Sequence, residues 1–371
     1  MPNFPFQRAK PLGWAVFEVL SSAQMNIVDQ NAAQAADGLV WTDVAQLRNW
    51  TTPAVVDGTA TPGLAYVWST YEQAWWNFGF ASGPIPVAYK LRGGAGGTWL
   101  ATGGILAGSG NLTPSRNGGD FDPVGNIMMM GGTPSASTAN KFRRYNAVTG
   151  VWTAPTSSQV SSAGVLCCKW AALQGLWIAG HANGIIETSP DGVTWTSRST
   201  GANSSSRWSI ASGPNSVVVA CNVSGNQIMQ SADGVTWNIR TLPSTTTWQN
   251  VVYVPLRGEF VVFNQDLSQV AFSTDGGTTW TARARTLPNG FTPTAYASMN
   301  AVAFGRNIAT TIYDASGTGQ NVIVYSQDGG VSWRAAASFG PTVRGPVASN
   351  GSQLWYTHDG NLSTSCIAGG F

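Results

Sequence analysis

The sequence predicts an all-β fold, a β-propeller of four-stranded blades behind a short helical N-terminal segment. Three observations lead to this prediction. A Ser-x-Asp-Gly phrase ending in Trp occurs four times at nearly even spacing. Each copy follows three short β-rich stretches. The 44 Gly and 17 Trp suit many tight turns that join aromatic-rich strands. Seven blades are favoured, with six as the alternative.

The repeated phrase reads as a hairpin turn. Its Asp can accept hydrogen bonds from the amides that follow, and its Gly supplies a positive φ. The Trp opens the next strand with its ring available to the core. We therefore expect a structural role for the phrase, without catalysis or calcium binding. Its four copies contain Ser189, Asp191 and Trp195; Ser231, Asp233 and Trp237; Ser273, Asp275 and Trp280; and Ser326, Asp328 and Trp333.

The stretches before each turn repeat as well. Ahead of the first copy they are Trp170-Ala171, Leu176 to Ala179 and Gly184 to Thr188. The first two intervals between the tryptophans are 42 and 43 residues, and the third is 53. Four short strands in a unit of this length are the signature of a propeller blade. Such units bury their faces against neighbouring copies.

The number of blades depends on weaker signals. The segment Ser115 to Phe121 is interpreted as a decayed copy of the turn, and another remnant ends at Gly150-Val151-Trp152. The last unit offers three strands after Trp333 and lacks a fourth. We expect an N-terminal strand within Leu64 to Phe78 to complete it and close the ring.

The four turns resemble the Asp-box (bacterial neuraminidase repeat) family, whose pattern is Ser-x-Asp-x-Gly-x-Thr-Trp. The third copy matches best, with its glycine at Gly277, whereas the first two copies are one residue shorter. The resemblance covers residues 165 to 335. It implies a propeller in which the box carboxylates lie on the edge away from the ligand face.

Residues 1–50 follow a different pattern and form a predicted attachment or oligomerisation segment, ahead of a propeller domain at 51–371. Ser21 and Gln24 form a capping box for a helix with a narrow apolar stripe. A second short helix is predicted from Asp43 to Trp50. So thin a stripe needs a packing partner. It either docks on the propeller or mediates assembly, with a homotrimer favoured. The stripe consists of Met25, Val28, Ala32 and Ala35.

The run from Gly13 to Asn26 resembles the opening of many tailed-phage virion proteins. In those proteins an aromatic stretch leads into Leu-Ser/Thr-x-x-Gln/Asp-Met-Asn and an alanine-rich helix. The similarity covers about 40 residues. It implies that this end joins the particle while the rest of the chain projects outward.

A sialidase-type glycosidase is the sharpest alternative, because Asp-box sialidases share this repeat. Glycosidases need two carboxyls across the scissile bond. The chain has four Glu and two His, and an early Arg-Ile-Pro motif is missing. Arg143-Arg144 is no substitute for that motif, so no catalytic residue is assigned. The four Cys lack metal-ligand spacing, and no metal or cofactor is expected.

Candidate ligand residues come from the over-long blade that ends at Trp333. Its extra residues are placed in Pro288 to Ser298 or in Asp314 to Gln320. Aromatic rings beside small polar groups suit carbohydrate faces. Loops of this kind also vary without having a function. The candidate residues are Phe291, Tyr296, Asp314 and Gln320.

Taken together, these features predict a non-enzymatic virion protein, tail or tail-fibre-associated, that binds host-surface carbohydrate or a neighbouring virion protein. A purely structural decoration protein and a sialidase-like hydrolase are the alternatives. A formal charge of +2 with scattered lysines excludes a nucleic-acid partner. No apolar run is long enough for membrane insertion. The expected location is the virion, with secretion as the alternative.

Overall fold

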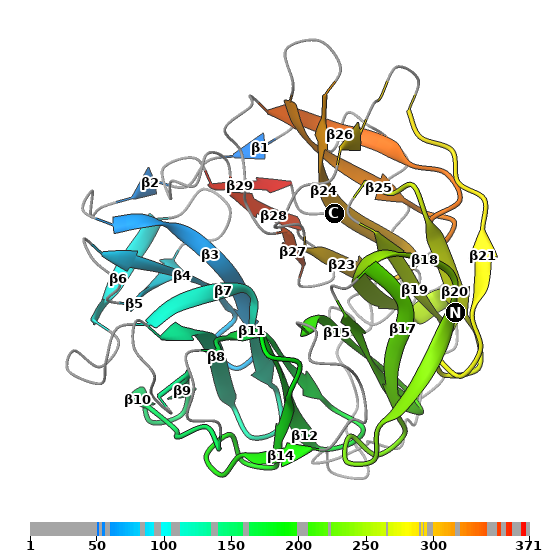
Figure 1. The fold of residues 1–371 in the computed structure, drawn as a ribbon. Helices are drawn as coiled ribbons and strands as arrows, with labels where there is room; N and C mark the ends of the chain where they lie inside the picture. The colour runs from blue at the N-terminus through cyan, green and yellow to red at the C-terminus, as the bar shows by residue number, and fades with distance from the viewer. Residues whose placement is uncertain are drawn as a thin grey trace, which may run out of the picture.

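Short strands arranged as a ring make up the structure, which is a computed structural model (Figure 1). It describes residues 50–51, 54–55, 60–81, 86–92, 98–104, 112–134, 140–158, 163–198, 207–221, 224–264, 266–288, 291, 293–294, 300–315, 320–339, 347–349, 354–357 and 365–368. The predicted N-terminal helices and the apolar stripe lie outside these residues. In the part of the chain that the structure describes, no helix is long and apolar enough to cross a membrane.

The described strands form five sheets, and two of these sheets each contain two blades. They therefore make seven blades, the favoured count. Blade 1 contains β3 (Ala60–Ser69), β4 (Ala74–Ala81), β5 (Pro86–Arg92) and β6 (Thr98–Gly104), with β2 (Ala54–Val55) beside β6. Blade 2 contains β7 (Leu112–Asp122), β8 (Ile127–Pro134), β9 (Phe142–Asn146) and β10 (Val151–Thr153). Blade 3 contains β11 (Val165–Ala171), β12 (Leu176–His181), β13 (Ile186–Ser189) and β14 (Thr196–Arg198).

One long strand joins the next two blades. Strand β18 (Asn238–Val254) is the outer strand of blade 4 and the inner strand of blade 5. Blade 4 also contains β15 (Arg207–Gly213), β16 (Ser216–Cys221) and β17 (Ser224–Ser231). The 3-10 turn η3 (Pro255–Arg257), β19 (Glu259–Asn264), β20 (Val270–Ser273) and β21 (Thr281–Arg283) continue blade 5.

Blade 6 contains β23 (Ala301–Phe304), β24 (Asn307–Asp314), β25 (Gln320–Ser326) and β26 (Arg334–Phe339). A further short strand, β22 (Pro293–Thr294), pairs with β24. Blade 7 contains β27 (Val347–Ser349), β28 (Leu354–Thr357) and β29 (Ser365–Ala368). The strands predicted from the repeat between residues 170 and 325 coincide with the first three strands of blades 3 to 6.

An N-terminal strand closes the ring, but it is a different strand from the predicted one. Strand β1 (Trp50–Thr51) pairs with β29 and supplies the fourth strand of blade 7. The segment Leu64 to Phe78 instead contributes to β3 and β4, the first hairpin of blade 1. Trp50 therefore lies in a strand and does not end a helix.

Of the two predicted turn remnants, the one that ends at Trp152 is confirmed and the one from Ser115 to Phe121 is wrong. Residues 147–150 form the turn between β9 and β10, and Asn146 Oδ1 accepts hydrogen bonds from the amides of Val148 and Thr149. This turn matches the position of the repeated phrase. The segment Ser115 to Phe121 lies within inner strand β7, where an irregularity separates Pro114 from Gly119, so its assignment as a turn is wrong.

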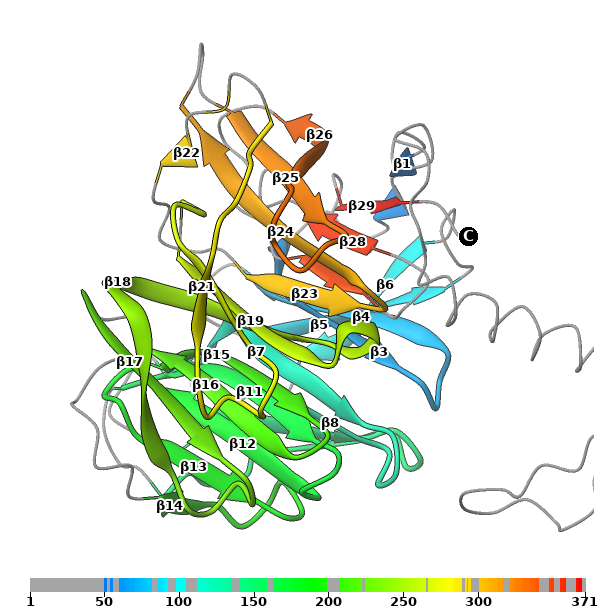
Figure 2. The same cartoon turned by 90° about the vertical axis from the view of Figure 1, so that its right-hand side faces the viewer.

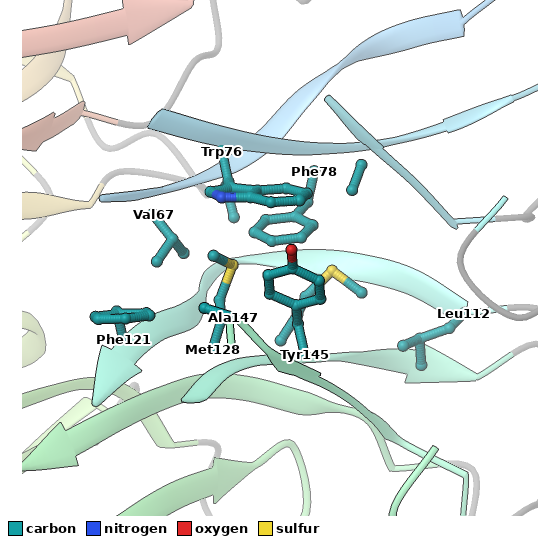
Figure 3. Packing of buried hydrophobic residues seen from close by; sticks show 11 residues of the cluster. Val67, Trp76, Phe78, Leu112, Phe121, Met128, Tyr145 and Ala147 are labelled. Atoms are coloured by element: carbon teal, nitrogen blue, oxygen red, sulfur yellow. The ribbon is translucent and has the colours of Figure 1, made fainter. Parts of the chain in front are cut away.

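The apolar core lies between neighbouring blades, as expected for a propeller. Figure 3 shows the cluster between blades 1 and 2, where Trp76 and Phe78 face Met128 and Tyr145. Trp152 completes this cluster, with its ring centroid 4.8 Å from that of Tyr145. The tryptophans of the four turns occupy the four following interfaces in the same way: Trp195, Trp237, Trp280 and Trp333.

Candidate ligand-binding sites

The four Ser-x-Asp turns satisfy their own hydrogen bonds. In the second copy, Asp233 Oδ1 accepts from the amides of Val235 and Thr236 at 2.8 and 2.7 Å. Ser231 Oγ donates to the same carboxylate and accepts from Gly234 N at 2.8 Å. The two amides lower the pKa of Asp233 to about 2. In the other three copies the Asp Oδ1 accepts the equivalent pair of amide hydrogen bonds, so each carboxylate binds the backbone of its own turn.

Each turn also contacts the blade before it. A backbone carbonyl of the turn accepts a hydrogen bond from the preceding blade in all four copies. The donors and acceptors are Arg144 Nε to Asp191 O (3.0 Å), Gln174 Nε2 to Ala232 O (3.4 Å), Ser216 Oγ to Gly276 O (2.7 Å) and Arg283 Nη1 to Gly329 O (2.6 Å). The turns therefore connect blade to blade, in addition to reversing the chain.

The extra residue in the two longer copies has a specific use. Trp280 Nε1 donates to Gly277 O, and Trp333 Nε1 donates to Gly330 O, both at 3.0 Å. In the shorter copies, Trp195 and Trp237 are equally buried, but their Nε1 atoms have no hydrogen-bond partner among the described residues. The carbonyl of the second glycine thus accepts a hydrogen bond from the indole N–H, and the shorter turn offers no such acceptor.

The ring has two distinct faces. The turn after each inner strand and the four Ser-x-Asp turns lie on one face, here called the turn face, because successive strands of a blade alternate in direction. Figure 2 shows this face to the right, at the turns after β3 and β7 and at the tip of β23. In blade 6, Ser326 pairs with Ile308 at the turn face, whereas Asp314 pairs with Gln320 at the opposite end.

The second hairpin of blade 6 extends further on the face opposite the turn face than the corresponding hairpins of blades 3, 4 and 5 do. Strands β24 and β25 form seven residue pairs, whereas the corresponding hairpins of blades 3, 4 and 5 form four. Three further pairs extend the hairpin by roughly 10 Å. Strand β22 pairs along this extension, Pro293 with Asp314 and Thr294 with Tyr313. The two segments that the sequence singled out are therefore neighbours, and we call this region the blade-6 edge.

The predicted ligand residues are distributed unevenly over the blade-6 edge. Asp314 and Gln320 are backbone partners across the hairpin. Phe291 packs against the apolar cluster between blades 5 and 6, which gives its ring a structural contact. Tyr296 lies outside the described residues. Asp314 and Gln320 are thus neighbours in the hairpin, whereas Phe291 packs on the apolar core.

A central cavity of about 320 Å³ is a second candidate, and the sequence did not reveal it. Tyr66, Trp68 and Phe121 give it aromatic walls. Lys169 Nζ lies 3.9 Å from Asp120 Oδ2 at its wall, and both side chains are partly exposed. Six blades contribute lining residues, and inner strands gather round the axis only once the ring has closed. The sequence therefore carries no local signal for this cavity.

Polar side chains connect the inner strands around this cavity. Asn300 Nδ2 donates to Val347 O, and its Oδ1 accepts from Val347 N, which joins blades 6 and 7. Ser209 Oγ bonds both N and O of Val251, joining blades 4 and 5. These side chains replace a backbone ladder between blades and keep the cavity walls fixed.

The glutamates of the propeller are held in buried networks. Glu72 accepts from Trp76 Nε1 (2.7 Å), Lys90 Nζ (2.8 Å) and Tyr145 OH (3.0 Å). Glu259 forms a two-point pair with Arg283, both contacts at 2.9 Å, and a further pair with Arg257.

Glu187 lies in a third buried network, between blades 2 and 3. His181 Nε2 lies 2.7 Å from Glu187 Oε2, and Ser157 and Ser158 donate to the same carboxylate. Burial opposes ionisation, but His181 and the two hydroxyls outweigh it and lower the pKa of Glu187 to about 2. Both Ser hydroxyls are directed to the carboxylate and not to the imidazole, so this is not the arrangement of a nucleophilic triad.

Among the described residues, Asp120 is the one carboxylate that lines the central cavity. No group of three or more His, Cys, Asp or Glu side chains in the described part of the chain could hold a metal ion.

Solved structures that resemble the chain are β-propellers. YCF48 bound to D1 peptide is 15% identical, with a TM-score of 0.56 and coverage of 86% of this chain and 94% of that one. An inactive virginiamycin B lyase from Staphylococcus aureus, solved with quinupristin, is 12% identical, with a TM-score of 0.57 and coverage of 86% of this chain and 98% of that one. The WD40 domain of Doa1 is 11% identical, with a TM-score of 0.55 and coverage of 86% of this chain and 96% of that one.

This likeness shows the fold: the chain is a β-propeller. Its neighbours include both a lyase and WD40 proteins, so the fold alone does not decide the activity. No protein-family model matches the chain, and no curated protein matches it. The resemblances to Asp-box repeats and to tailed-phage proteins stay predictions from the sequence motifs.

Proposed function

We propose that the protein is a non-enzymatic virion component, tail or tail-fibre-associated, that is attached through residues 1–50. Its propeller binds a host-surface glycan through the blade-6 edge. The observation that carries the proposal is the placement of two features on opposite faces. The chain enters the propeller at the turn face, through Trp50, while the blade-6 edge projects from the other face. An attached receptor-binding protein needs this separation.

The chemistry of the described residues supports binding over hydrolysis. Glu72, Glu187 and Glu259 are engaged by Lys, His and Arg partners inside the ring. A glycosidase needs two carboxyls about 5 to 9.5 Å apart across an open site. Asp314 and Gln320, in contrast, pair in the backbone of the longer blade-6 hairpin. A carboxylate and an amide are groups that bind sugar hydroxyls.

A glycan array that includes bacterial surface polysaccharides tests the proposal with the full-length protein. We expect binding to one glycan class, lost in a Tyr296→Ala/Asp314→Ala variant. The control, Val193→Ala on the turn face, should bind as the wild type does. Hydrolysis of a fluorogenic sialoside would contradict the non-enzymatic assignment. Equal glycan binding by the double variant and the control would contradict the blade-6 edge as the site.

A further inference from the structure

The aromatic wall of the central cavity is one side of the blade-1 sheet. Tyr66 and Trp68 lie on inner strand β3, and Trp75 on β4 is the cross-strand partner of Trp68. These three side chains occupy the side of the sheet opposite to Val67 and Trp76, which pack toward blade 2. The ring of Trp68 is partly exposed, and its centroid lies 5.3 Å from that of the buried Trp75. A braced aromatic ring therefore lines the cavity.

A buried amide without a partner lies beside this wall. Asn77 is the cross-strand partner of Tyr66, so both side chains are on the same side of the sheet. Asn77 is fully buried, and neither its amide oxygen nor its amide nitrogen has a hydrogen-bond partner among the described residues. Buried amides in native proteins are almost always hydrogen-bonded. We therefore expect a water molecule or a ligand hydroxyl next to this wall.

A carboxylate and an ammonium group complete the polar part of the cavity. Asp120 Oδ2 accepts a hydrogen bond from Trp170 N at 3.0 Å, which orients the carboxylate. Asp120 Oδ1 accepts no hydrogen bond from the part of the chain that the structure describes. Lys169 Nζ lies 3.9 Å from Asp120 Oδ2, too far for a hydrogen bond, so its donors stay available. Both side chains are partly exposed at the cavity wall.

The cavity can be entered from the turn face. Thr70 and Pro123 line it and are exposed in the turns that follow β3 and β7. Inner strands surround the axis on which the cavity lies (Figure 1). Its volume of about 320 Å³ is at the small end of the roughly 300–1,000 Å³ of ligand sites. The ligand must therefore be small.

The charges of the lining select against most small ligands. Asp120 and Lys169 are the charged residues among the described lining, and their charges cancel. An anion is repelled by Asp120 and a cation by Lys169. A wholly apolar ligand would desolvate both charges without offering either a hydrogen bond. A neutral ligand with an apolar face and several hydroxyls meets all of these conditions, because each hydroxyl both donates and accepts.

We propose that the central cavity binds a neutral sugar ring, either a monosaccharide or the end residue of a glycan. The C–H face of the ring stacks on Trp68. One hydroxyl donates to Asp120 Oδ1, and another accepts from Lys169 Nζ, both as charge-assisted hydrogen bonds. This site is separate from the blade-6 edge, which lies on the opposite face of the ring. Its existence does not depend on the proposed function.

Ligand-observed NMR titration of the full-length protein tests the site, with the methyl glycosides of glucose, galactose, mannose and N-acetylglucosamine. We expect one of them to bind the wild type. Asp120→Asn and Lys169→Met should each weaken this binding by about tenfold, because each removes a charge-assisted hydrogen bond. Asp120→Asn keeps an oxygen for Trp170 N, which preserves the wall.

The matched control is Asp266→Asn, in the connection between β19 and β20. Asp266 accepts a hydrogen bond from Ser268 N and is not part of the cavity lining, so this variant should bind as the wild type does. A third variant, Trp68→Ala, should weaken binding severalfold through the loss of stacking. The Tm of each variant verifies that the propeller is folded.

Several results would overturn the proposal. One is that no methyl glycoside binds the wild type, and another is equal affinity in Asp120→Asn, Lys169→Met and the control. Glycine betaine, a zwitterion without hydroxyls, is titrated in parallel, and its binding in place of the sugars would contradict the ligand class.

The Tyr296→Ala/Asp314→Ala variant distinguishes this site from the blade-6 edge. We expect it to retain binding of the methyl glycoside in the cavity. If that binding were lost in this variant and kept in Asp120→Asn, the cavity proposal would be wrong and the proposed function would stand.

Discussion

Gly329→Ala probes the connection between a Ser-x-Asp turn and the blade before it. Gly329 has a φ of 74°, and an added Cβ would collide with the Glu259 carboxylate and the Arg283 guanidinium. Gly150 occupies the corresponding turn of blade 2 with a φ of 70°, and its Cβ would meet no atom within 4 Å. The two substitutions share the backbone penalty and differ in the contact between blades.

The magnitudes follow from that difference. Alanine at positive φ costs about 1–2 kcal/mol, which is the whole effect expected for Gly150→Ala. Gly329→Ala also shifts the ends of the Glu259 and Arg283 side chains, whose ion pair would cost about 3 kcal/mol if it were lost completely. At roughly 2 °C per kcal/mol, Gly329→Ala should lower the Tm further than Gly150→Ala does, by up to about 6 °C.

Differential scanning calorimetry of both full-length variants measures this difference. A double-mutant cycle with Glu259→Gln should show coupling between Gly329 and Glu259. Equal Tm values for Gly329→Ala and Gly150→Ala would show that the turn does not stabilise the contact between blades and acts only on its own backbone.

Three further predictions concern the same interfaces. The pKa of Glu187 is lowered in the folded protein, so ionised Glu187 stabilises the fold fully above its ordinary pKa of 4.5, and this contribution is lost as pH falls toward about 2. Between pH 5 and 2 the Tm of the wild type should therefore fall more steeply than that of Glu187→Gln. Parallel curves of Tm against pH would contradict this. Asp233→Ala should cost about 1 kcal/mol and Asp233→Asn less, since Asn keeps an acceptor for the two amides; denaturant unfolding decides, and equal losses would argue against the amide bonds. The ring of Trp195 stacks on Phe142 at 4.0 Å, so Trp195→Ala should cost about 3–5 kcal/mol, and a loss under about 1 kcal/mol would contradict its place in the core.

The repeat made most of the propeller predictable. The turn residues, such as Asp191 and Gly192, mark where the third strand of a blade ends. The positions of the other strands in that blade can then be predicted from this point. Between the turns, short apolar stretches such as Leu176 to Ala179 fall within strands. The same logic identified the over-long blade, whose extra residues lengthen β24 and β25.

Errors arose where no such phase marker exists. Trp50–Thr51 is a strand of two residues, too short for a period, and the helix signal before it extended across Trp50. Ser115 to Phe121 has turn-type residues, but Ser115 Oγ bonds Val165 O of the next blade and Gly118 has no room for a Cβ, so these residues serve an irregular inner strand.

The candidate sites were predictable only in part. Asp314 and Gln320 were found through the excess length of their blade, whereas the packing of Phe291 on the core depends on a neighbouring blade. The cavity gathers residues from six blades, and the turn face gathers turns from the whole ring. Such surfaces result from ring closure, which no local pattern encodes.

Light-scattering mass of the full-length protein tests whether the chain assembles through its N-terminal segment. We predict an oligomer, with a trimer favoured, that becomes a folded monomer in the Met25→Asp/Val28→Asp variant. The Gln30→Asp/Gln34→Asp control should keep the mass of the wild type. A wild-type monomer, or a variant with unchanged oligomeric mass, would contradict assembly through this stripe.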